Sequence, residues 1–87
     1  MSNKVIKTFV MRDTTDNILI ENDYKILKAI SKSDDIALEV YYLCDEYASM
    51  SYTTFSIHEE GESFYGFDFE CVVSNTIKTE LFLFSEI

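Results

Sequence analysis

Hydrophobic and polar residues alternate along the N-terminal segment of the chain. Residues 4–12 place Val5 and Phe9 on one face, and this period of two predicts a strand. The polar residues 13–17 predict a turn, because Asp, Asn and Thr favour turn conformations. Residues 18–20 then predict a short return strand.

The next segment has the spacing of a short helix. Asn22 or Asp23 is a good N-cap for it, and Ile26, Leu27 and Ile30 share one side of the helix that would follow. The polar residues 31–35 then interrupt the pattern.

A second helix is predicted over residues 35–49. Ile36, Val40, Leu43 and Tyr47 are spaced by four, three and four residues, so they lie on one helical face. Asp34 and Asp35 would begin this helix, where the macrodipole favours acids. The β-prone residues 40–42 leave a strand as the alternative for the same segment.

The C-terminal part predicts strands again. Residues 52–59 and 63–73 alternate, and Glu60-Gly61-Glu62 between them predicts a turn. The last strand, 76–86, is apolar on both faces, which suggests a central position or cover by a helix. The predicted fold is therefore a single α+β domain, residues 1–87, in the order β-β-α-α-β-β-β, with two helices packed on one face of an antiparallel sheet of about five strands.

The charge is distributed unevenly along the chain. The formal net charge is −9, and no lysine or arginine occurs between Ser33 and Ile77, where ten carboxylates lie. Such a field attracts cationic partners and repels nucleic acid and anionic membrane surfaces. With 47% hydrophobic residues the chain is not of the disordered class, and it has no apolar leader at its start, so we expect a cytoplasmic protein.

The residues that could perform catalysis or bind a metal are few. His58 is the only histidine, and the two cysteines, Cys44 and Cys71, form no C-x-x-C pair, so we expect no metal and no cofactor. Two reduced thiols are the favoured state of the cysteines, with a disulfide as the alternative. A Cys44–His58 dyad is conceivable, but nearby acids disfavour a thiolate. We therefore expect a protein that is not an enzyme.

Two groups of acidic and aromatic residues suggest a surface that binds another protein. One is a stripe on the predicted second helix, and the other lies in and after the predicted turn at 60–62. The stripe comprises Asp35, Glu39, Tyr42 and Glu46. The second group comprises Glu59, Glu60, Glu62, Tyr65, Asp68 and Glu70. Aromatic side chains anchor interfaces, and carboxylates complement lysine and arginine.

The function that these features favour is inhibition of a basic protein. An immunity protein or antitoxin that neutralises a cationic ribonuclease or deoxyribonuclease toxin would have this profile, with carboxylates where phosphates would bind. The alternative is a phage-encoded DNA mimic directed against a restriction or CRISPR effector. A small enzyme that uses His58 ranks lower, as does a structural subunit or homodimer whose acids only keep it soluble.

Overall fold

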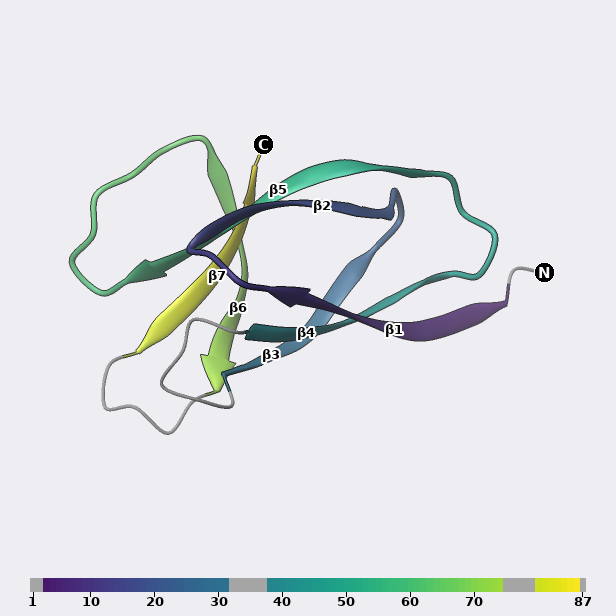
Figure 1. The fold of residues 1–87 in the computed structure, drawn as a ribbon, viewed down its shortest axis with the longest axis horizontal. Helices are drawn as coiled ribbons and strands as arrows, with labels where there is room; N and C mark the ends of the chain where they lie inside the picture. The colour runs from purple at the N-terminus through teal and green to yellow at the C-terminus, as the bar shows by residue number, and fades with distance from the viewer. Residues whose placement is uncertain (1–2, 32–37, 75–79, 87) are drawn as a thin grey trace.

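The computed structural model describes residues 3–31, 38–74 and 80–86, which form seven strands and no helix (Figure 1). The strands are β1 (Lys4–Met11), β2 (Thr15–Glu21), β3 (Lys25–Ser31), β4 (Leu38–Asp45), β5 (Met50–Glu59), β6 (Phe67–Ser74) and β7 (Leu81–Glu86). The predicted α+β class is therefore wrong, and the fold is all-β.

The strands form one mixed sheet that curls into a nearly closed barrel, in the order β1-β4-β3-β6-β7-β5-β2. All neighbours are antiparallel except β3 and β6, which run parallel. The outermost strands, β1 and β2, come beside each other, but no strand ladder joins them. The apolar strand β7 has a neighbour on each side, in keeping with its expected central position.

The segment predicted as the first helix is strand β3, because a β-bulge mimics helical spacing. The register of β3 against β4 shifts between Ile26 and Lys28, so Leu27 and Lys28 are both exposed before Ala29 turns inward again. The expected N-cap residues lie in the turn before β3. The Asn22 N–H donates to the Ser49 carbonyl at 2.7 Å.

The segment predicted as the second helix contains strand β4, the alternative that the β-prone residues 40–42 left open. Its buried positions alternate strictly, and the residues are Leu38, Val40, Tyr42 and Cys44. Val40 fits both periodicities, and β4 pairs with β1 on one side and β3 on the other. Because β4 has a paired strand on both sides, this segment is a strand and not a helix. Ile36, Asp34 and Asp35 lie outside the described residues.

The turn after β5 is longer than expected. Gly61 has a positive φ of 87°, as a turn there requires, but Gly66 also has a positive φ, 88°. Residues 63–66 therefore belong to a loop, and the strand predicted to begin at residue 63 begins at Phe67. Residues 75–79, in which a turn and the start of the last strand were expected, lie outside the described part of the chain.

Apolar side chains from all seven strands fill the barrel. The buried ones are Met11, Ile20, Ala29, Leu38, Val40, Tyr42, Cys44, Phe55, Val73 and Leu83. Phe9 and Phe55 contact each other with ring centroids 5.0 Å apart, so aromatic packing links β1 to β5 across the interior.

An ion pair whose carboxylate is buried joins β1 to β2, which no strand ladder links. The Glu21 carboxylate at the end of β2 is 1% exposed, and it accepts hydrogen bonds from Lys7 Nζ of β1 at 2.5 Å and from Tyr42 Oη of β4 at 2.9 Å. Burial opposes ionisation of Glu21, but the hydrogen bonds outweigh it and lower its pKa to about 2. Side chains thus close the barrel where backbone pairing does not.

Candidate protein-binding surface

Aromatic side chains gather on the outer face of the β5–β7–β6 layer. The antiparallel register places His58 opposite Phe82, and Ser56 opposite Phe84, on the face turned away from the barrel interior. Phe69 of β6 is opposite Phe84 from the other side. Residues directly opposite in antiparallel strands point to the same face, so three strands contribute to one surface.

The rings form a connected cluster. The imidazole of His58 stacks on Phe64 with centroids 3.7 Å apart, and Phe84 contacts Phe64 at 4.6 Å and Phe69 at 5.7 Å. Phe67 meets His58 edge-on at 5.8 Å. We name this cluster of His58, Phe64, Phe67, Phe69 and Phe84 the aromatic face.

Polar contacts hold the loop of residues 60–66 against this face. The Glu62 carboxylate pairs with His58 Nδ1, and the Glu62 N–H donates to the Glu59 carbonyl at 3.2 Å. The hydrogen bond with His58 lowers the pKa of Glu62. These contacts fix the first part of the loop and so position Phe64.

Ser56, His58 and Glu62 have the order of groups found in a catalytic triad. His58 Nε2 lies 2.7 Å from Ser56 Oγ, and Nδ1 meets the carboxylate. However, Ser56 is 1% exposed, so its hydroxyl has no access to a substrate in this structure. The three groups instead hold the loop against β5.

Part of the aromatic face is open to solvent. Phe69 is 55% exposed, the neighbouring Val72 is 54% exposed, and Phe64 is 37% exposed. Tyr65, in the same loop, is exposed almost completely. Adjacent large apolar side chains left in water are typical of a surface that another molecule covers.

The strands and the loop that form this surface carry charges of one sign. Described residues 50–74 and 80–86 contain seven carboxylates and no lysine or arginine. The acids are Glu59, Glu60, Glu62, Asp68, Glu70, Glu80 and Glu86. The surface is therefore complementary to a cationic partner.

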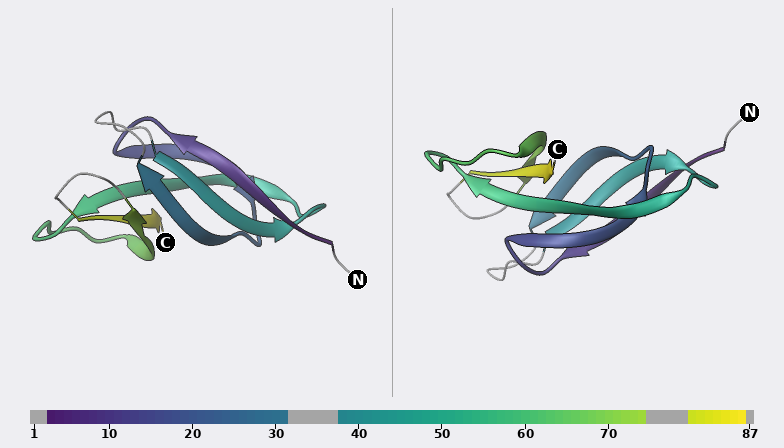
Figure 2. Two further views of the ribbon diagram at one scale, coloured as in Figure 1. Left: turned by 90° about the horizontal axis from the view of Figure 1, so that it is seen from below. Right: turned by 90° about the horizontal axis from the view of Figure 1, so that it is seen from above.

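The two predicted groups of site residues differ in how the structure places them. The second group lies at the end of the long axis opposite the N-terminus, at the end of β5, on the loop and on β6 (Figure 2). Asp68, of that group, is opposite the buried Ser85 and so points to the other face of β6 from Phe69. Glu70 is half-buried and lies toward β3.

The helical stripe does not exist, because β4 turns alternate residues to opposite faces. Tyr42 is buried in the core at 5% exposed, whereas Glu39 lies on the outer face and accepts a hydrogen bond from Tyr41 Oη at 3.1 Å. Glu46 is exposed in the β4–β5 turn at the far end of the molecule. Asp35 lies outside the described residues.

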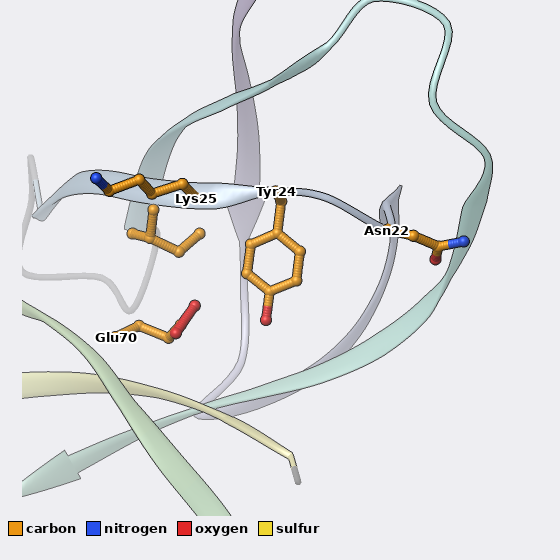
Figure 3. A pocket seen from close by; sticks show the side chains of 5 residues that line it. Asn22, Tyr24, Lys25 and Glu70 are labelled. Carbon is orange, nitrogen blue, oxygen red and sulfur yellow. The ribbon is translucent and has the colours of Figure 1, made fainter.

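A hollow of about 460 Å³ opens between β3 and β6. Its lining residues are Asn22, Tyr24, Lys25, Ile26 and Glu70. Figure 3 shows the phenol of Tyr24 and the carboxylate of Glu70 pointing toward one another across it. Because the lining carries a carboxylate, an ammonium, an amide and a phenol, the hollow suits a polar group better than an apolar one.

The sequence did not reveal Phe64, Phe69 and Phe84 as one cluster. They lie on a loop and on two strands, and only the β6–β7 register and the fold of the loop bring them together. Their one sequence signal was the excess of phenylalanine after residue 50. The hollow gave no signal at all, because it depends on where β3 and β6 separate.

Both cysteines are free thiols. Burial raises the pKa of Cys44, and it raises the pKa of Cys71 to about 11, so neither is an activated nucleophile. Within the described ranges no group of three or more His, Cys, Asp or Glu side chains is arranged to hold a metal ion. The same part of the chain has no helix that is long and apolar enough to cross a membrane.

Comparison of the chain with protein-family models, with curated proteins and with solved structures found no match.

Proposed function

We propose that this chain is an inhibitor that binds and neutralises a cationic protein, and that the partner is a nuclease toxin. The observation that carries the proposal is the aromatic face, which leaves Phe69 in water and is built from strands and a loop that carry carboxylates and no cation in described residues 50–74 and 80–86.

The chemistry of the surface fits the basic cleft of a nuclease. Such a cleft presents lysine and arginine to phosphates, and carboxylates at Glu59 and Glu60 would pair with the same groups. Exposed rings at Phe64 and Phe69 can stack on arginine or fill the place of a base. The aromatic rings would supply affinity, and the acids would supply rapid association.

The proposal is tested by capture with matched variants. Tagged wild-type chain, Glu60→Lys and Glu46→Lys are exposed to a native host extract at low salt, and the retained proteins are compared. Both glutamates are exposed turn residues, and both substitutions change the net charge equally. The β5–β6 loop and the β4–β5 turn that carry them lie at opposite ends of the long axis, along which the molecule extends 42 Å (Figure 1).

We expect a basic nuclease that binds the wild type and Glu46→Lys, and that binds Glu60→Lys about ten-fold more weakly. The purified nuclease should lose activity when the wild-type chain is added. A partner held equally by both variants would contradict the proposed surface. Self-association without any other partner would favour the homodimer instead.

A further inference from the structure

The parallel strands β3 and β6 are joined over only a short length. They pair at Ala29–Val73 and Ile30–Ser74, near their C-terminal ends, and diverge toward their N-terminal ends (Figure 1). Residues 25–28 of β3 and 67–72 of β6 therefore face each other without strand pairing. Each strand is paired on its other side, with β4 and β7 respectively. These edges present unpaired backbone groups, which can form hydrogen bonds with another strand.

The hollow lies in the gap that this divergence leaves. Tyr24 and Lys25 reach it from the β3 side, and Glu70 reaches it from β6 (Figure 3). A side chain from an added strand would enter this space, because residues of a strand alternate toward and away from a neighbouring surface. The hollow and the free edges thus form one binding groove, which we name the β3–β6 seam.

The charge in the seam selects the side chain that would enter. Glu70 is half-buried, and burial together with the neighbouring Asp68 raises its pKa. No ion pair joins Glu70 to a cation in the described part of the chain, although Lys25 lines the same hollow. A partly dehydrated carboxylate beside a phenol is complementary to a guanidinium or ammonium group.

We propose that the β3–β6 seam binds an extended segment of the cationic partner. The backbone of that segment adds to the free edge of β6, and one of its arginine or lysine side chains enters the hollow and pairs with Glu70. This inference rests on the proposed function and specifies how part of the partner is held: by strand addition, with main-chain hydrogen bonds for affinity and one charged pocket for specificity.

The test uses the full ¹⁵N-labelled chain and a defined peptide, acetyl-Thr-Arg-Val-Arg-Thr-amide, followed by NMR. We expect the largest amide shifts in residues 24–28 and 70–72, on the two sides of the seam. A peptide N-methylated at its central valine should bind more weakly, because it has lost a strand hydrogen bond. The same peptide with glutamate in place of arginine should not bind.

Three charge variants are expected to change the affinity of the peptide in different directions. Glu70→Gln should raise the dissociation constant of the arginine peptide about ten-fold, and Lys25→Gln should lower it about two-fold by removing a like charge. Glu46→Gln, with the same change of charge as Glu70→Gln but at the far end of the molecule, should leave it unchanged. Folding of each variant is checked by the dispersion of its amide spectrum.

Three results would overturn the seam while leaving the proposed function intact. One is a set of shifts confined to His58, the loop 60–66 and β7, which would place the peptide on the aromatic face. Another is an equal dissociation constant for Glu70→Gln and Glu46→Gln. The absence of any shift would also overturn the seam, whereas the proposed function is tested separately by the Glu60→Lys capture experiment.

Discussion

The Glu21→Gln substitution removes the negative charge that pairs with Lys7 and so links β1 and β2, the two outermost strands of the sheet. Glu21 is nearly inaccessible, and its carboxylate accepts hydrogen bonds from Lys7 and Tyr42, which belong to two other strands. Glutamine keeps the shape of the side chain but cannot form the ion pair. We therefore expect a folded barrel that is less stable than the wild type at neutral pH.

The size of the loss follows from the pKa of Glu21. The fall from 4.5 to about 2 is worth about 3.5 kcal/mol of stability at pH 7, at roughly 1.4 kcal/mol per pH unit. Because the Lys7 side chain is 41% exposed, water screens the attraction between its ammonium group and the Glu21 carboxylate. We therefore expect a smaller loss of stability, about 2 kcal/mol. For a domain of this size that corresponds to a fall in melting temperature of about 10 °C.

The pH dependence of the stability difference between wild type and Glu21→Gln shows whether the charge of Glu21 causes it. The pKa of Glu21 is depressed in the folded state, so its contribution is complete above about pH 4.5 and is lost as the pH falls toward 2. Urea unfolding of wild type and Glu21→Gln at pH 7 and pH 3 should give a difference that shrinks at pH 3 to less than half its neutral value. Equal stabilities at pH 7, or a difference that stays constant down to pH 3, would refute the assignment.

Three further predictions concern the loop, the aromatic face and the thiols. Gly66→Ala should cost about 1 kcal/mol in urea unfolding, because φ is +88° and no heavy atom crowds the site, and an unchanged midpoint would contradict this conformation. Phe84→Ala should speed amide exchange across residues 60–66, because Phe84 supports Phe64; unchanged exchange would show that the rings do not hold the loop. Cys44 and Cys71 should resist a thiol reagent at pH 7 in the folded chain and both react in denaturant; rapid reaction of either in the folded state would contradict its raised pKa.

The strands that alternate cleanly could be predicted from the sequence. The strand predicted at 4–12 is β1, and the strand predicted at 52–59 lies within β5, which begins two residues earlier. The two predicted helices failed for different physical reasons. A bulge gave β3 a helix-like spacing, whereas apolar residues on both faces of β4 fitted a helical period by coincidence.

The candidate surface could be predicted only in part. The acids of the loop and β6 were visible as a run without cations, and the structure keeps them together at one end of the molecule. The burial of Tyr42 and of Glu21 could not be predicted, because it depends on a partner strand far away in the sequence. The same is true of the aromatic face, whose contacts arise from the β5–β7–β6 register.

The most direct measurement is the affinity of the captured basic partner for two variants that each remove one exposed ring. Phe69→Ser removes a ring from the aromatic face, and Tyr52→Ser removes one, 68% exposed, that lies opposite Leu19 on the β2–β5 pair. We predict that Phe69→Ser weakens binding about thirty-fold, which is the effect of losing an interface anchor worth about 2 kcal/mol, and that Tyr52→Ser has no effect. Equal affinities for the two variants, or a loss only in Tyr52→Ser, would contradict the aromatic face as the binding surface.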